Sequence, residues 1–167
     1  MPTHRENNTK IALDLNKLNK KLQEINSLFI IKLHPFVLEF YKHTYKELFS
    51  NIVFHNANGD IYPLLKYVDV LVSDYSSIVY DFLLLNKPII FYNYDIDEYK
   101  KNVSLLFDYN EFSPGIKVET QDELENSFLQ ENLYFKQREK IKNLFFDKIA
   151  QNICSKNVIN KLLEGNR

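Results

Sequence analysis

The sequence has no tryptophan, one cysteine and three glycines among its 167 residues. A single cysteine, Cys154, excludes a disulfide within this chain and any metal site built from clustered cysteines. No apolar run approaches the ~20 residues that a membrane-spanning helix needs. The first ten residues, MPTHRENNTK, lack the apolar core of a signal peptide. These absences favour a protein of the reducing cytoplasm.

Neither sign of charge dominates the chain. It has 21 basic and 22 acidic residues, a net charge of -1, and therefore lacks the positive field that nucleic-acid binding requires. Hydrophobic residues make up 45% and charged residues 26%, which is typical of a globular protein. A chain of this length can bury one core. We therefore expect a single domain over residues 1–167 and no nucleic-acid partner.

Two hydrophobic periods alternate along the chain. Short apolar, β-rich runs predict buried strands, whereas apolar residues at steps of three and four predict helices. Expected strands lie at 28–33, 52–55, 68–74, 88–94 and 116–120. Expected helices lie at 9–26, 36–49, 61–68, 76–86 and 95–102, with a loop at 107–115 and two or three helices within 121–164. This βαβ alternation predicts a doubly wound, mostly parallel, Rossmann-like α/β sheet with extra C-terminal helices.

The segment VLVSDYSSIVYDF, at 70–82, joins an expected strand to an expected helix. The strand ends at Asp74, and Ser76 and Ser77 open the helix at the carboxyl edge of the sheet. Free backbone N–H groups and two hydroxyls at such a point can bind a diphosphate. A serine cap on a helix that merely packs explains the same residues equally well.

Three basic side chains are expected near the same edge. His34 follows the strand at 28–33 and could donate to a phosphate oxygen, although a structural hydrogen bond accounts for it too. His4 and Arg5 precede the first helix. They would lie beside this edge if a strand preceded them, and such a strand would be central in a doubly wound order. A solvated, charged terminus is the alternative.

The acidic residues of YNYDIDEY, at 92–99, follow the strand at 88–94. Asp95, Asp97 and Glu98 could accept hydrogen bonds from ribose or polyol hydroxyls. They could equally cap a helix or lie solvated in its first turn. They are too close together in sequence to predict a metal site, so no metal is expected.

Taken in order, several segments resemble one family, the CDP-glycerol glycerophosphotransferases that make teichoic acids and capsules. The segments are MPTHRE, IIKLHP, DVLVSDYSSIVYDFLLLNKPIIFYNYDIDEY and FDYNEFSPGIKVET. The resemblance implies the C-terminal, nucleotide-binding half of a two-domain GT-B fold. It implies a CDP-glycerol or CDP-ribitol donor, a polyol-phosphate or glycan acceptor, and release of CMP at the inner face of the cell membrane. The CDP-polyol is a substrate, and no cofactor is expected.

The same resemblance implies roles for individual residues. His34, Ser76 and Ser77 would contact the donor phosphates, while Asp74 and Tyr75 would shape the turn. His4 and Arg5 would line the cleft. The other half of these enzymes carries a Trp-His-Gly segment with the usual candidate for the catalytic base, and this chain has no tryptophan. We therefore expect the base in another half or a second copy, and we expect this chain alone to be inactive.

Other functions remain open. The same phosphate-binding edge would serve a GT-B glycosyltransferase that uses a sugar nucleotide. A non-catalytic, truncated remnant that acts as an interaction domain is a third possibility. A receiver-like module fits less well, because its early strand should end in an acidic cluster and here it ends in His34.

Overall fold

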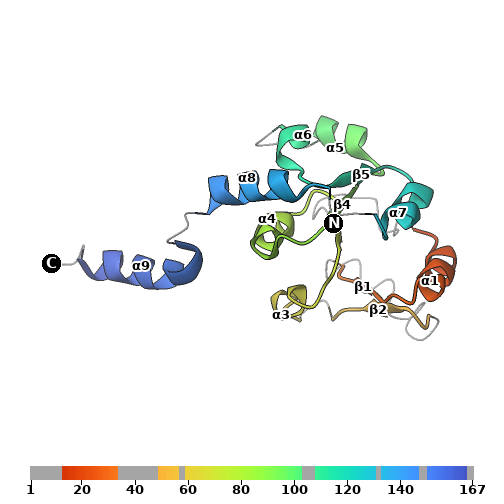
Figure 1. Ribbon diagram of the computed structural model, residues 1–167, viewed down its shortest axis with the longest axis horizontal. Coiled ribbons are helices and arrows are strands. Elements are labelled where there is room, and N and C mark those ends of the chain that lie inside the picture. The colour runs from red at the N-terminus through yellow and green to blue at the C-terminus, as the bar shows by residue number, and fades with distance from the viewer. Residues whose placement is uncertain are drawn as a thin grey trace.

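A computed structural model describes residues 13–33, 49–56, 59–102, 108–130, 133–146 and 150–164. Figure 1 shows their arrangement. The strands are β1 (Phe29–Ile31), β2 (Ile52–Phe54), β3 (Leu71–Ser73), β4 (Ile89–Tyr92) and β5 (Ile116–Val118). The helices are α1 (Leu15–Glu24), α3 (Tyr62–Leu65), α4 (Ile78–Phe82), the 3₁₀ turn η1 (Leu83–Leu85), α5 (Ile96–Asn102), α6 (Tyr109–Phe112), α7 (Gln121–Ser127), α8 (Phe135–Phe145) and α9 (Ala150–Glu164).

Each expected strand is present, although shorter than its apolar run. In the part of 121–164 that the structure describes there are three helices, within the expected two or three. The helix expected over 36–49 lies outside the described residues, apart from Phe49. Two expectations were wrong in detail: 107–115 contains the one-turn helix α6, and 76–86 is two short helical pieces, α4 and η1.

Local hydrogen bonds explain where several helices begin. Asp14 accepts from the amides of Asn16 and Lys17 at 3.0 and 3.1 Å and starts α1. Asp108 accepts from the amide of Glu111 at 2.9 Å, which is why a single turn forms within the expected loop. Thr120 starts α7 in a reciprocal capping box with the residue three positions on.

The helical segment 78–85 changes from α4 to the 3₁₀ turn η1 because of how it ends at Asn86. Asn86 adopts the left-handed region with φ 49°, and its amide donates to the carbonyl of Leu83 at 3.1 Å. This tightens the last turn into η1, and Pro88 just beyond cannot continue a helix. The Asn86 side chain is also held, because it accepts from Arg138 Nε at 3.1 Å and donates to Glu139 at 3.1 Å.

All strand pairs among the described residues are parallel, which confirms the expected α/β class. Phe29 pairs with Ile52 between β1 and β2, and Leu71 pairs with Ile89 between β3 and β4. β5 pairs with β4 on its other side. Within the described residues the sheet forms two pieces, β1–β2 and β3–β4–β5. The central strand expected ahead of His4 falls outside these residues and stays a prediction.

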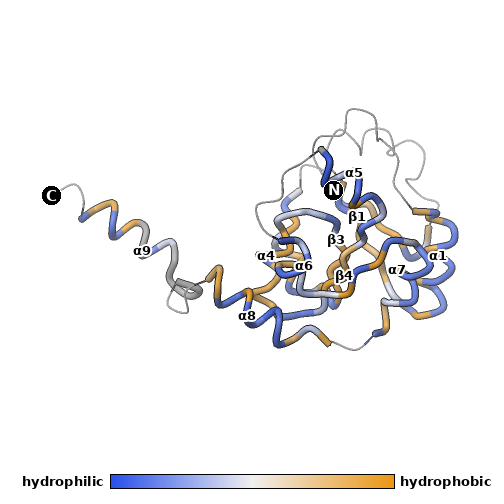
Figure 2. The backbone as a smooth tube through the Cα atoms, turned by 90° about the horizontal axis from the view of Figure 1, so that it is seen from above, coloured by the Kyte–Doolittle hydropathy of each residue, from blue (hydrophilic) through white to orange (hydrophobic). Residues whose placement is uncertain are grey.

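Both faces of the three-stranded piece are covered, as a doubly wound sheet requires. Side chains alternate along β4. Ile89 and Phe91 pack in one buried cluster with residues of α4 and α8, whereas Ile90 and Tyr92 pack in another with Leu124 of α7. Figures 1 and 2 show α4 and α8 on one side of β4 and α7 on the other. Successive residues of β4 are therefore all buried, consistent with a strand that is apolar throughout.

The two-stranded piece has its own cluster. Leu15, Leu18 and Leu22 of α1 pack against Ile31 and Ile52. Phe128, which follows α7, packs against this cluster and also against the one on the α7 face of β4. A second link joins the N-terminal ends of α1 and α7: the Gln121 side chain accepts from the Asp14 amide at 2.7 Å and donates to the Asp14 carbonyl at 2.9 Å. These contacts join the two pieces of the sheet.

Candidate functional site

Polar residues follow the adjacent strands β3 and β4 where each strand ends. Ser73 and Asp74 are 8% and 6% exposed at the end of β3. Asn93, which follows β4, is 5% exposed. Because β3 and β4 are parallel, with Ser73 opposite Phe91, these polar residues lie at one carboxyl edge. Ligands of open α/β sheets bind at such an edge, so we take it as the candidate site.

Tyr75 ties the two strand ends together. Its hydroxyl donates to an Asp95 carboxylate oxygen at 3.0 Å. Its ring stacks on Tyr99 of α5, with centroids 3.9 Å apart and planes within 14°. The segment after β3 is thus attached by one polar and one aromatic contact to the segment after β4. The expected role of Tyr75 in shaping the turn stays a prediction.

Tyr109 of α6 is the third aromatic ring of a cluster with Tyr75 and Tyr99. Its hydroxyl donates to Asn93 Oδ1, and its ring lies 5.9 Å from that of Tyr75. Burial raises the pKa of Tyr109 to about 12, and the charge of Asp74 contributes to the rise. The phenol therefore stays protonated at neutral pH and acts as a hydrogen-bond donor rather than a base.

Ser76 and Ser77 lie between this cluster and α4. Ser76 is half-buried and Ser77 is exposed. Ser77 occupies the N-cap position of α4, yet its side chain makes no capping hydrogen bond. The main chain begins the helix instead, since the carbonyl of Ser77 accepts from the amide of Tyr80 at 3.0 Å. The serine-cap alternative therefore does not account for the side chain of Ser77.

The acidic residues after β4 divide into two kinds. Asp97 and Glu98 are exposed in the first turn of α5, where negative charge favours the helix dipole. Asp95 is half-buried and accepts from Tyr75. The structure thus gives Asp95 an internal role that the sequence did not suggest. A contact from these three residues to a polyol or ribose stays a prediction.

The structure brings together only part of the predicted site. Asp74, Tyr75, Ser76 and Ser77 lie together, with Asp95 held against Tyr75. His4, Arg5 and His34 lie outside the described residues, so the expected meeting of His34 with the serines stays a prediction.

Sequence reasoning missed Asn93, Tyr99 and Tyr109 as members of this cluster. Tyr99 follows Asp95 by four residues, a spacing that places both on one face of a helix, and this was the available signal. Tyr109 lies 16 residues from Asn93 in the chain. No local pattern points to that contact, which only the fold creates.

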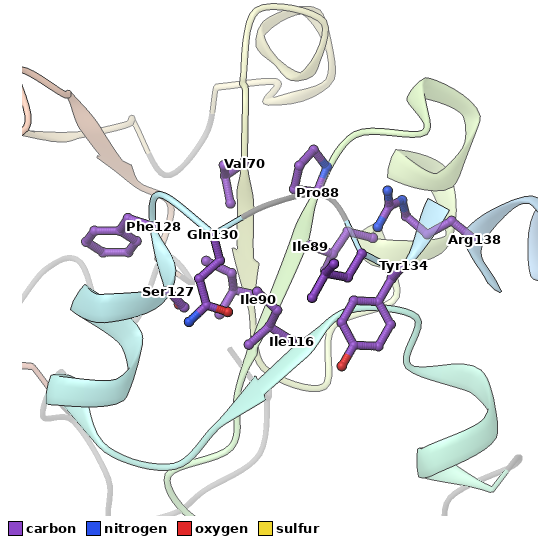
Figure 3. Close-up of a pocket in the computed structure, with 11 residues that line it drawn as sticks. Val70, Pro88, Ile89, Ile90, Ile116, Ser127, Phe128, Gln130, Tyr134 and Arg138 are labelled. Carbon is purple, nitrogen blue, oxygen red and sulfur yellow. The ribbon is translucent and has the colours of Figure 1, made fainter. Parts of the chain in front are cut away.

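A small hollow lies at the opposite edge of the sheet, where β3, β4 and β5 begin (Figure 3). Its lining is largely apolar and includes Val70, Ile90, Ile116 and Phe128. Arg138 also lines it, but this side chain is only 1% exposed and its Nε donates to Asn86. The hollow contains none of the residues predicted for the site.

Two features are absent from the described parts of the chain. Within those parts, no helix is both long and apolar enough to cross a bilayer. Among the same residues, no three His, Cys, Asp or Glu side chains gather as metal ligands would.

Comparison with known proteins identifies relatives along nearly the whole chain. The family described as CDP-glycerol:poly(glycerophosphate) glycerophosphotransferase matches residues 1–164. A teichoic acid poly(ribitol-phosphate) polymerase of Bacillus spizizenii is 33% identical over 154 residues, which are 87% of this chain and 24% of that protein. A teichoic acid poly(glycerol phosphate) polymerase of the same organism is 31% identical over 157 residues, which are 92% of this chain and 39% of that protein.

A solved structure shares the fold. The wall teichoic acid polymerase TagF superposes with a TM-score of 0.69 and 22% identity, over 96% of this chain and 43% of that one. This likeness confirms a GT-B-like α/β fold. The chain spans only 24% and 39% of the length of the two Bacillus relatives.

Proposed function

Because this chain belongs to the CDP-glycerol glycerophosphotransferase family, we propose that it is the donor-nucleotide-binding part of a teichoic-acid-type polyol-phosphate transferase. The observation that carries the proposal is the family match over residues 1–164. The relatives reported above are polymerases of ribitol phosphate and of glycerol phosphate. A CDP-activated polyol is therefore the donor class, and both glycerol and ribitol are candidates.

The proposed reaction is transfer of a polyol phosphate. An acceptor hydroxyl oxygen attacks the phosphorus that carries the polyol, and the bond from this phosphorus to the CMP oxygen breaks. CMP leaves with the electron pair, and the acceptor proton passes to a base. The acceptor is a growing polyol phosphate or a glycan, and capsular polymers fall within this class. A structure of a TagF variant soaked with CDPG supports a CDP-activated donor.

In this chain, the carboxyl edge would hold the donor diphosphate. Ser77, exposed and without a capping bond, and Ser76 beside it would donate to phosphate oxygens. His34 would add a donor or a positive charge. Asp74 and Tyr75 would shape the turn, and His4 and Arg5 would line the cleft. Stabilising charge on the diphosphate as CMP leaves is the catalytic contribution that we assign to this edge.

We assign the base that deprotonates the acceptor to another half of the enzyme or to a second copy of the chain. This chain covers 24% and 39% of the length of the two Bacillus relatives. These shares support an active site that is formed by more than this part of the enzyme. Teichoic acid polymers are the products named for the relatives. We therefore place the complete enzyme in the cytoplasm, peripherally at the inner face of the cell membrane.

Isothermal titration calorimetry of the full chain with CDP-glycerol and CDP-ribitol tests the proposal. We expect weak binding of at least one of them and no turnover by the chain alone. Ser77→Ala should lower the affinity about three- to tenfold, which corresponds to one lost hydrogen bond. His34→Ala should lower it about tenfold or more, because its bond to phosphate is charge-assisted.

Matched controls are Ser50→Ala and His43→Ala, neither of which carries a predicted role, and both should leave the affinity unchanged. Tighter binding of a uridine-diphosphate sugar than of either CDP-polyol would favour the glycosyltransferase alternative. Failure to bind any of these nucleotides would contradict the proposed function and favour the interaction-domain alternative.

A further inference from the structure

Tyr75 is the first residue after the buried Asp74 and the last before Ser76. Besides its ring contact with Tyr109, two of its side-chain contacts reach the segment that follows β4. The hydroxyl donates to Asp95 at 3.0 Å, and the ring stacks on Tyr99 at 3.9 Å. Together these three residues form a unit that we call the tyrosine latch.

The tyrosine latch lies next to the start of α4, which has no side-chain helix cap. Ser77, the N-cap residue of α4, makes no side-chain capping bond, and α4 itself has only five residues before it tightens into η1. A short helix contributes little stability of its own, so tertiary contacts must fix where it begins. Tyr75 supplies such contacts two residues before Ser77.

Asp95 and Tyr99, the other end of the tyrosine latch, are themselves held by backbone hydrogen bonds. Asp95 lies just ahead of α5, and its carbonyl accepts from the amide of Tyr99 at 2.9 Å. The carboxylate that receives the Tyr75 hydroxyl and the ring on which Tyr75 stacks therefore belong to one turn of chain. That turn follows Asn93, which is buried and bonded through its backbone to Val118 at 2.7 Å.

We propose that Tyr75 is a positioning residue of the donor site, whose latch to Asp95 and Tyr99 sets the position of Ser76 and Ser77 relative to the end of β4. The inference rests on the proposed function of the two serines as ligands of a nucleoside diphosphate ester. It gives Asp95 the role of an anchor for Tyr75 rather than a direct contact to the polyol or ribose. Tyr75 itself need not touch the donor.

A double-mutant cycle on the full chain tests this assignment. Tyr75→Phe keeps the ring and removes the hydrogen bond, and Asp95→Ala removes the same bond from the other side. Each should lower the affinity for CDP-glycerol or CDP-ribitol about three- to tenfold. The double variant should lose no more than either single variant, because both changes break one interaction. Asp95→Asn should restore part of the affinity, since an amide oxygen still accepts from the phenol.

Amide hydrogen exchange supplies a second measurement that needs no ligand. Exchange of the amides at 76–79 should become about three- to tenfold faster in Tyr75→Phe, while the rest of the sheet keeps its protection. Tyr62→Phe is the matched control, because it removes another tyrosine–aspartate bond, of 2.9 Å to Asp81. That bond reaches α4 near its end, so affinity and exchange at 76–79 should both stay unchanged.

Different results of these experiments would contradict the tyrosine latch and the proposed function. Loss of affinity in Asp95→Ala without loss in Tyr75→Phe means that Asp95 contacts the donor directly, and it overturns the latch. Unchanged amide exchange in Tyr75→Phe also overturns it. A wild-type chain that binds neither CDP-polyol contradicts the proposed function, and the exchange measurement then still decides whether Tyr75 fixes the turn.

Discussion

Tyr109 shows how one partly buried side chain makes the candidate site sensitive to pH. Burial raises its pKa from an ordinary value of 10.0 to about 12, while its hydroxyl donates to Asn93. In the unfolded chain the phenol loses its proton near pH 10, but in the folded chain it keeps the proton up to about pH 12. Its contribution to stability is therefore fully present below pH 10 and is lost as the pH rises through 12.

The effect of Tyr109 on stability should be measurable between pH 10 and 12. The free energy of unfolding of the wild type should fall in this window by up to about 1.4 kcal/mol per pH unit more than that of Tyr109→Phe. Denaturant unfolding at several pH values measures both. All other residues are the same in both proteins, so the difference between the two curves isolates Tyr109. Parallel curves would show that the phenol ionises alike in the folded and unfolded chains.

At the scale of elements, Gly115 controls how closely β5 approaches β4. A Cβ atom at this position would lie 2.2 Å from the carbonyl oxygen of Ile89 and 3.0 Å from the ring of Phe91. The backbone cannot retreat easily, because the next residue, Ile116, pairs with Ile90 in the sheet. This contact gives a physical reason for a glycine between the loop and the strand.

We expect Gly115→Ala to destabilise the domain by about 1–3 kcal/mol through overpacking against the backbone. Gly59→Ala is the control: its Cβ would lie 2.8 Å from a ring carbon of His55, a side chain that can turn away. Urea denaturation of both variants measures the difference. Equal losses would mean that β5 shifts to accept the methyl group.

The elements also show what the sequence could predict. The five strands were predictable because each is a short apolar run with breakers beside it. The turn α6 was missed, although Asp108 with Glu111 three residues later is a capping pattern, because Pro114 and Gly115 marked the whole segment as a loop. The tightening into η1 was not predicted: it comes from the left-handed backbone of Asn86, whose side chain is also held by Arg138 and Glu139 from a distant helix.

At the scale of the whole molecule, α9 stands apart. Figures 1 and 2 show it beyond α8, away from the sheet. The three buried clusters formed by the described residues contain no residue of α9, and Ile159, Leu162 and Leu163 are 55–65% exposed. By contrast, α8 supplies Arg138 and Ile141 to the buried interior.

A variant that ends at Phe146 should therefore fold. We expect its thermal midpoint to lie within about 2 °C of the full chain, because the side chains of α9 that the structure describes lie outside the buried clusters. A variant that ends at Gln130 loses α8 as well and should unfold or melt far lower. Differential scanning calorimetry of both tests the point. A large loss on removing α9 alone would show that it contacts the body of the domain in solution.

The whole site was predictable only in part. The order of strand ends placed Asp74, Ser76 and Ser77 at the carboxyl edge, since parallel strands end at a common edge. The latch from Tyr75 to Asp95 and Tyr99 was not predictable, because it depends on how two segments pack after their strands end. Sequence periodicity carries no information about such contacts.

The carboxyl edge of β3 and β4 is where we propose that a CDP-activated donor binds. Titration of the ¹⁵N-labelled chain with CDP-glycerol, followed by NMR, locates the nucleotide directly. We expect the largest amide shifts at 74–77, with further shifts around His34. Shifts concentrated instead at Ile116 and Phe128, around the hollow at the opposite edge, or no shifts at all, would contradict this proposal.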